Sequence, residues 1–155
     1  MAKDIGKQFE EKIRAALKEI QRKKGIFYHR LKDTTAARNI VGSAPADFLV
    51  AMAGQAQLWE AKASEIHGSL TSCLSNMVSD HQVGVHQLWM MNGCTAFFIF
   101  YSDLTAQVEV WHSDDVIAAR KTGKPIRGHP KAYFHVDDLA IELPHLFHLR
   151  RAHDV

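Results

Sequence analysis

The apolar positions near the N-terminus predict one long amphipathic helix over residues 4–24. They recur at three- and four-residue steps, which places them on one helical face: Ile5, Phe9, Ile13, Ala16, Leu17 and Ile20. Basic residues complement the helix dipole just before Gly25, where we expect the helix to end. Glu10 lies at the border of the apolar stripe. It is either a solvated residue paired with Arg14 or a carboxylate that reaches a site from the edge of the buried face.

Further apolar runs predict short strands. Residues 26–31 are rich in aromatic and branched side chains and predict an edge or second strand. Residues 47–52 and 56–62 predict the two strands of a hairpin, with a turn around Ala53-Gly54. The polar segment 32–46 contains glycine and proline and predicts a loop. Loops of that length within a domain usually carry function or mobility.

The second half of the chain predicts two helices and two strands. Ser79 is a typical N-cap for a helix that runs to about residue 92. Residues 95–101 are nearly all apolar, as in a central strand buried on both faces. Residues 107–111 alternate between polar and apolar and predict a more exposed strand. The motif Ser113-Asp114-Asp115 predicts the cap of a short helix.

This order of elements predicts an α/β fold with a mixed central β-sheet flanked by helices. The 155 residues suit a single domain spanning 1–155, in which we expect residues 122–155 to form a C-terminal wrapping segment. No apolar run approaches the ~20 residues of a membrane span, and the N-terminus lacks the apolar core of a signal peptide. The two cysteines are isolated, which argues against a disulfide scaffold. These features predict a cytoplasmic protein with no membrane partner.

The net charge, the histidines and the tryptophans exclude few classes of function. The net charge of +2 permits nucleic-acid binding without arguing for it, although the basic residues are clustered. No histidine pair has zinc-motif spacing together with a third ligand, so we expect structural or surface histidines. We expect Trp59, Trp89 and Trp111 in the core or at an interface.

The predicted hairpin brings acidic and basic residues together. Residues i and i+2 of a strand share a face, so Glu60 and Lys62 point the same way. A two-residue turn would pair Met52 with Gln55 and set Asp47 opposite Glu60, with the two Cβ atoms about 5 Å apart. Two carboxylates at that spacing repel unless they share a cation. The hairpin therefore favours a magnesium-type site beside a lysine.

The same pattern has a simpler interpretation, a solvated strand face with a cross-strand charge pair. An E-x-K triplet is expected about 0.5 times by chance in a chain of this length. A second copy, Glu10-Glu11-Lys12, lies in the predicted helix, where positions i and i+2 diverge by about 200°. The Glu60-Ala61-Lys62 triplet is therefore evidence for a metal site only in combination with the motifs around it.

Those surroundings resemble a known family, the RecU-type Holliday-junction resolvases of the PD-(D/E)xK nuclease superfamily. The matching motifs fall in order along residues 5–127: Gly6-Lys7, Phe9-Glu10, Asp47-Phe48, Gly54, Trp59-Glu60-Ala61-Lys62-Ala63-Ser64, His81-Gln82, Gly93, Ala96-Phe97-Phe98-Ile99-Phe100 and Gly123-Lys124-Pro125-Ile126-Arg127. The resemblance implies a restriction-endonuclease-like core in a homodimer, bacterial or phage-encoded. It also implies an enzyme of DNA recombination and repair that resolves branched DNA, specifically four-way junctions, by paired symmetric nicks, with no small-molecule substrate.

The resemblance also implies a role for each site residue. Asp47 and Glu60 would bind Mg²⁺, for which Mn²⁺ would substitute, together with the carbonyl oxygen of Ala61. Lys62 would orient the attacking water or stabilise charge on the phosphoryl oxygens. Glu10 would contact the metal directly or through water, and Gln82 would help to order the site. The residues expected to contact DNA phosphates are Arg30, Lys32, Arg38, Lys7, Arg22, Lys23 and Lys24.

Two departures from the family pattern leave alternatives open. Pro45 stands two residues before Asp47 rather than next to it. Residues 32–43 are either a shortened form of the family's projecting DNA-binding segment or an ordinary surface loop. Another PD-(D/E)xK nuclease, acting on linear or single-stranded DNA, is the nearest alternative. A non-catalytic DNA-binding accessory protein of recombination is the alternative from a different class.

Overall fold

The structure of the protein is a computed structural model that describes residues 4–31 and 46–149. Lys32 and Arg38, and all but the last residue of the expected 32–46 loop, lie outside these ranges. The elements in chain order are α1 (Ile5–Lys24), β1 (Phe27–Arg30), β2 (Phe48–Met52), β3 (Gln55–Ser64), η1 (Leu70–Cys73), α3 (Leu74–Met77), α4 (Asp80–Met91), β4 (Thr95–Ser102), β5 (Gln107–His112), α5 (Ser113–Thr122), β6 (Ala132–His135), η2 (Val136–Asp138), α6 (Leu139–Glu142) and η3 (Leu143–Phe147).

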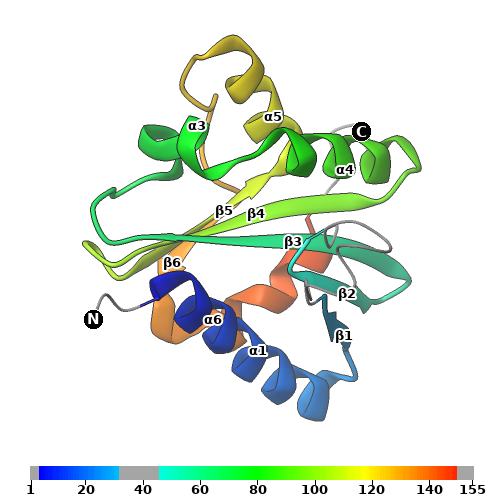
Figure 1. Ribbon diagram of the computed structural model, residues 1–155. Coiled ribbons are helices and arrows are strands. Elements are labelled where there is room, and N and C mark those ends of the chain that lie inside the picture. Colours follow the sequence, from blue (N-terminus) through cyan, green and yellow to red (C-terminus); the bar gives the residue numbers. More distant parts are fainter. Residues whose placement is uncertain (1–3, 32–45, 150–155) are drawn as a thin grey trace, which may run out of the picture.

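The centre of the molecule is a six-stranded mixed sheet in the order β1-β2-β3-β4-β5-β6. β3 and β4 pair in parallel, and the other neighbours pair antiparallel. α1 and α6 cover one face, and α3, α4 and α5 lie over the other (Figure 1). The predicted α/β class, a mixed central sheet flanked by helices, is confirmed. No helix within the described ranges is long and apolar enough to cross a membrane.

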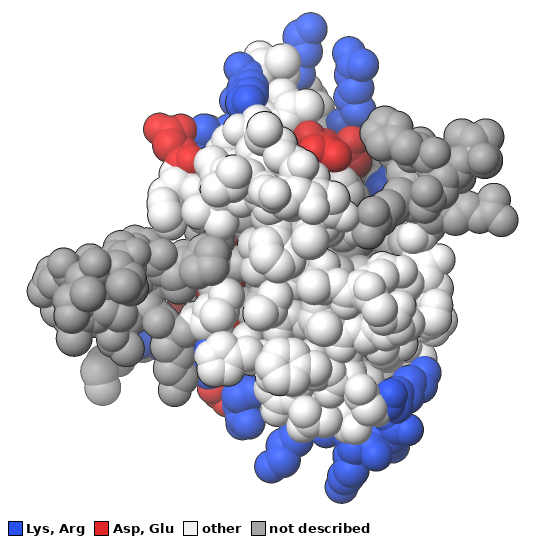
Figure 2. Space-filling view, turned by 90° about the vertical axis from the view of Figure 1, so that its right-hand side faces the viewer, with Lys and Arg blue, Asp and Glu red and all other residues white. Residues whose placement is uncertain are grey.

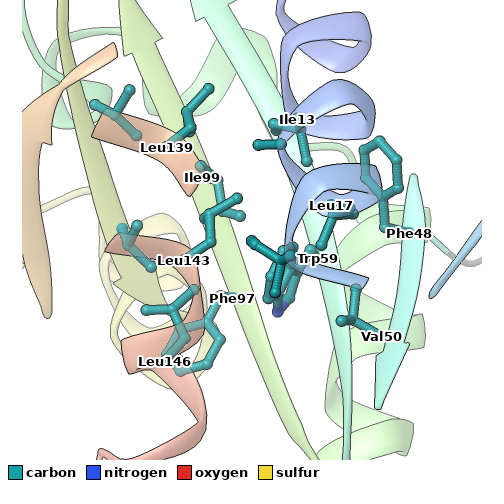
Figure 3. Close-up of a cluster of buried hydrophobic side chains, with 14 of the residues drawn as sticks. Ile13, Leu17, Phe48, Val50, Trp59, Phe97, Ile99, Leu139, Leu143 and Leu146 are labelled. Atoms are coloured by element: carbon teal, nitrogen blue, oxygen red, sulfur yellow. The ribbon is translucent and has the colours of Figure 1, made fainter. Parts of the chain in front are cut away.

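The core consists of an apolar layer on each face of the sheet. On the α1 face, Ile13 and Leu17 pack toward Trp59 and the strand residues Phe97 and Ile99 (Figure 3). On the other face, alternate residues of the same strand, Phe98 and Phe100, pack under α4 and α5. β4 is therefore buried on both faces, as its apolar run predicts.

Helix α1 and the β2–β3 hairpin agree closely with the sequence. The side chain of Asp4 caps α1 by accepting from the backbone N–H of Lys7, and Gly25 ends the helix in the left-handed conformation. Met52 pairs with Gln55 across a two-residue turn. Ala53 and Gly54 both have positive φ (52° and 76°), the geometry that matches the twist of a tight hairpin. The predicted hairpin register is confirmed.

The prediction of a more exposed β5 was wrong. Residues Val108 to Trp111 are all buried, because β6 pairs with the strand and residues 134–147 pack over the core on its α1 face. Glu109 tolerates burial because its carboxylate accepts from the indole N–H of Trp111 (2.8 Å) and the backbone N–H of Leu70 (3.3 Å). The C-terminal segment therefore supplies a strand and core side chains as well as covering the domain.

Two local predictions also need correction. His112, not Ser113, caps α5, since its imidazole accepts from the backbone N–H of Asp114, while Ser113 is buried within the helix. The second strand of the hairpin, predicted over residues 56–62, runs from Gln55 to Ser64, and the short helices η1 and α3 lie between it and α4.

Candidate active site

The candidate site lies at an open edge of the sheet where β3 continues beyond β2. The β2–β3 ladder ends at the pair Phe48–Trp59, whereas β3 stays paired with β4 as far as Ser64. α1 contacts β3 from one face of the sheet. An open cleft of about 420 Å³ occupies this edge. Its lining residues are Asp4, Gly6, Lys7, Glu10, Asp47, Glu60, Ala61, Lys62, Ala63, Asn76 and Met77.

Asp47 is fixed in this cleft by the backbone on both sides. Its N–H donates to the carbonyl of Trp59 (3.2 Å), and its own carbonyl accepts from the N–H of Leu31 (2.8 Å). Its Oδ2 accepts from the N–H of Ala61 at 2.7 Å. Asp47 therefore sits one residue beyond the last paired position of β2, with its carboxylate beside Glu60-Ala61 on β3.

Glu60 and Lys62 share a face of β3, as the strand period predicts. The side chain of Glu60 is 7% exposed, and its Oε1 lies 3.3 Å from Nζ of Lys62. The same oxygen accepts from Nε2 of Gln82 at 2.7 Å. Gln82 is in turn held by a capping box with Ser79, whose backbone N–H donates to the Gln82 Oε1 (3.1 Å). The first turn of α4 thus orients the Glu60 carboxylate.

Glu10, Asp47 and Glu60, three of the carboxylates that line the cleft, have raised pKa values. Burial raises the pKa of Glu10 to about 7, helped by a hydrogen bond and charge repulsion from Asp47 and opposed by Arg30. Burial and the negative charge of Glu60 raise the pKa of Asp47 to about 6. Burial also raises the pKa of Glu60, which Lys62 opposes. The cleft therefore holds more negative charge than its own basic residues neutralise, and either protons or a cation would relieve the repulsion.

The residues present fit a hard divalent cation. Asp47 and Glu60 supply carboxylate oxygens, the ligands that Mg²⁺ and Mn²⁺ prefer. The N–H of Ala61 points toward Asp47 at the edge of β3 that no strand covers. The N–H and C=O of one strand residue point to the same side of the strand, so the Ala61 carbonyl also faces this edge. Within residues 4–31 and 46–149, no three His, Cys, Asp or Glu side chains form a ready-made metal cage. Two carboxylates, one carbonyl and retained waters suit Mg²⁺, which rarely uses an all-protein cage.

The expected phosphate-binding residues are spread unevenly around the cleft. Lys7 lines it, and Arg30 pairs with Glu10 at 3.4 Å and also with Glu11. The basic cluster of residues 22–24 lies at the other end of α1, more than three turns or roughly 18 Å beyond Glu10. The structure thus brings Lys7 and Arg30 to the cleft and leaves the α1 end cluster away from it.

Sequence reasoning missed the wall of the cleft formed by Asn76 and Met77 of α3. The only local signal was Ser69, a residue typical of N-caps, whose side chain accepts from the N–H of Thr71 at the start of η1. The four residues of α3 are too few for an apolar period to be recognised in the sequence. The position of α3 beside β3 depends on tertiary packing, which a local pattern does not predict.

His86 and two of the tryptophans are core residues. Nδ1 of His86 lies 2.8 Å from Oγ of Ser113, and its ring stacks on Phe98 at 4.6 Å between centroids. Burial lowers the pKa of His86 to about 4, so the imidazole is neutral near pH 7. Trp59 and Trp111 are buried, as expected.

Comparison with known proteins gives only distant similarity. No protein-family model matches the chain, and no curated protein matches it by sequence. It is similar to the solved structure of Hjc, a Holliday junction resolvase from the archaeal hyperthermophile Archaeoglobus fulgidus, with a TM-score of 0.47 and 17% identity over 70% of this chain and 78% of that one. It is also similar to SSO0001, with a TM-score of 0.34 and 10% identity over 90% of this chain and 58% of that one.

Proposed function

We propose that this protein is a magnesium-dependent, structure-selective endonuclease that resolves four-way DNA junctions by paired symmetric nicks. The observation that carries this proposal is the cleft in which Glu10, Asp47, Glu60 and Lys62 converge from α1, the start of β2 and β3. The order of motifs that resembles RecU-type resolvases places the same residues in catalytic roles.

Each side chain has a distinct part in phosphodiester hydrolysis. Asp47, Glu60 and the Ala61 carbonyl would hold Mg²⁺, with Glu10 in contact directly or through water. When bound, such an ion polarises the phosphate and makes water a better nucleophile near neutral pH. Lys62 orients the attacking water or stabilises the charge that grows on the phosphoryl oxygens. Gln82 holds Glu60 in place from α4.

The surroundings of the cleft suit a polymer recognised through its backbone. The cleft is open at the sheet edge, so a DNA strand can pass along it without being enclosed. Lys7 and Arg30 beside the carboxylates would contact phosphates, which positions a strand but reads no base sequence. Selectivity would then come from the shape of the DNA.

We propose further that the protein acts as a homodimer, in which C₂ symmetry supplies two equivalent clefts for two symmetric nicks. The sequence from His81 to Ser102 contains no Asp, Glu, Lys or Arg, although α4 lies on the surface. Leu88 and Met91 of α4 are 63% and 82% exposed. The face toward which the C-terminal end of α4 points has an uncharged middle, with Lys and Arg toward its upper and lower ends and Asp and Glu also in its upper part (Figure 2). Exposed apolar residues without charges favour this face as the subunit contact.

The decisive experiment compares a four-way junction with a linear duplex of the same sequence in Mg²⁺. The junction should be nicked symmetrically on opposed strands, and the duplex should be cut little. Two fixed clefts engage phosphates at one separation, which splayed junction arms can meet but straight duplex reaches only by bending, at a cost of several kcal/mol. Ca²⁺ should permit binding and block cutting, because its larger and looser coordination misplaces the attacking water.

Asp47→Asn and Glu60→Gln serve as controls on the same preparations. Each should abolish cleavage and keep junction binding, since each removes a proposed cation ligand and lowers repulsion toward phosphate. Cleavage within tenfold of wild type for either variant would contradict the site assignment. Equal cutting of junction and duplex would favour a general nuclease, and junction binding without cleavage in Mg²⁺ or Mn²⁺ would favour an accessory protein.

A further inference from the structure

Arg30 is held at the edge of the cleft by two glutamates of α1. Its Nη2 lies 3.4 Å from Oε2 of Glu10, and its Nη1 pairs with Oε1 of Glu11. The other oxygen of Glu11 accepts from Nε of Arg14 at 2.9 Å. The backbone also fixes Arg30 here, because the next residue, Leu31, donates its N–H to the carbonyl of Asp47.

Glu10 is therefore shared between two neighbours of opposite charge. The Arg30 guanidinium lies at one of its oxygens, and Asp47 interacts with the same carboxylate from within the cleft. A divalent cation beside Asp47 would attract Glu10 and repel Arg30. A cation and a guanidinium that both interact with one carboxylate repel each other at a distance of a few ångströms. The partial burial of Glu10 and Arg30 strengthens that repulsion.

We infer that Arg30 is a positioning residue that competes with the cation for Glu10, so that cation binding releases its guanidinium toward a DNA phosphate. This inference rests on the proposed function, because it assumes a cation and DNA at the same cleft. Arg30 thereby couples the two ligands. A cation makes Arg30 available to DNA, and by linkage DNA that engages Arg30 makes Glu10 available to the cation.

The surrounding charges allow this exchange without leaving a buried charge unpaired. After release, Glu10 would face the cation, and Glu11 would keep its pair with Arg14. Glu11 is 51% exposed, so the loss of one of its two partners costs little. The Arg30 side chain is 20% exposed at an edge strand and can turn outward without crossing the core. A planar guanidinium is well suited to phosphate, which it binds in a bidentate manner.

The first test is titration calorimetry of the metal-free protein with Mn²⁺ alone, in the absence of DNA. Arg30→Gln should bind Mn²⁺ about three- to tenfold more tightly than wild type, because the competing charge is gone. Arg14→Gln is the matched control, since it removes a guanidinium that pairs with Glu11 but not with Glu10, and should stay within twofold. Arg30→Lys keeps the charge and should remain near wild type. A gain in affinity cannot result from damage to the fold.

A double-mutant cycle locates the effect at Glu10. In a Glu10→Gln background, the change from Arg30 to Gln should alter Mn²⁺ affinity less than it does in wild type.

The second measurement is the ratio of the junction affinity with Ca²⁺ to the junction affinity without Ca²⁺. This ratio should fall at least threefold in Arg30→Gln and stay at the wild-type value in Arg14→Gln.

The outcomes separate this inference from the proposed function. Unchanged or weaker Mn²⁺ binding by Arg30→Gln would overturn the competition, while junction cleavage by the wild-type protein would leave the proposed function standing. Tighter Mn²⁺ binding by Arg30→Gln in a protein that cuts no junction would support the competition and overturn the nuclease proposal. Failure of every variant to take up Mn²⁺ would overturn both.

Discussion

At the scale of single residues, Glu10 and Asp47 differ most from ordinary surface carboxylates. They are separated by most of α1, β1 and the segment up to residue 46, yet both line the same cleft and each affects the pKa of the other. Neighbouring Glu11 has the opposite environment, because Arg14 and Arg30 lower its pKa. The pKa values of two adjacent glutamates on one helix are therefore shifted in opposite directions.

This difference gives a prediction for the metal-free protein. The pKa of Glu10 rises from 4.5 to about 7 and that of Asp47 from 3.8 to about 6. The folded state then binds more protons than the unfolded chain between about pH 4 and 7, so the free energy of unfolding falls as pH rises through this window. Glu10→Gln removes the penalty. It should stabilise the protein at pH 8 by about 1–3 kcal/mol and at pH 5 by less than about 1 kcal/mol.

Urea denaturation in EDTA at pH 5 and pH 8 measures the effect. Glu11→Gln is the control, because a lowered pKa places its titration below this range and its effect should be similar at both pH values. Addition of Mg²⁺ should raise the thermal midpoint of the wild-type protein more at pH 8 than at pH 5, since the cation competes with protons. A Glu10→Gln effect that is equal at pH 5 and pH 8 would contradict the raised pKa.

At the scale of elements, the site depends on a difference in strand length and on a helix cap. β2 stops at the point where Asp47 turns its carboxylate toward Ala61, and β3 continues into the open edge. Helix α4 begins beside this edge. Gln82 uses one end of its amide to close the capping box and the other to hold Glu60. One side chain thus connects helix stability with site geometry.

The two functions of Gln82 can be separated. Ser79→Ala removes the cap but keeps the contact between Gln82 and Glu60, so it should cost about 1 kcal/mol of stability and leave cleavage near wild type. Gln82→Glu keeps an acceptor for the N–H of Ser79 but replaces the donor to Glu60 with a carboxylate oxygen. Cleavage should fall at least tenfold, by more than any accompanying decrease in the thermal midpoint explains. Thermal melts and nicking assays on both variants test this separation. If the loss of cleavage is proportional to the loss of stability in both variants, Gln82 has no positioning role.

At the scale of the whole molecule, the distribution of charge distinguishes two sides. The cleft edge carries the carboxylates and their basic partners. Residues 81–102, which comprise α4 after its first residue and the following strand β4, contain no Asp, Glu, Lys or Arg, and the face toward which the C-terminal end of α4 points is uncharged in its middle (Figure 2). A dimer through that surface would leave both clefts free for DNA.

The proposed dimer gives a prediction about mass in solution. Leu88→Glu combined with Met91→Glu should convert the dimer to a monomer, because a two-fold contact sets like charges against each other. Light scattering during gel filtration measures the mass. Ile141→Glu is the control, since Ile141 is equally exposed (64%) but lies on α6, and it should leave the dimer intact. A wild-type protein that is monomeric at all concentrations would contradict the proposal.

The sequence by itself determined the features that local physics controls. The apolar stripe and its caps define α1, and the Ala53-Gly54 turn with the two-residue period of strands sets the register that puts Glu60 and Lys62 on one face. The tertiary structure decided what depends on distant partners. The burial of β5 requires β6, and the contact of Gln82 with Glu60 requires the packing of α4. The placement of Glu10 beside Arg30 and Asp47 requires α1 to pack against β3. Such contacts join residues far apart in the chain, and their geometry is set by the packing of whole elements, which local patterns do not contain.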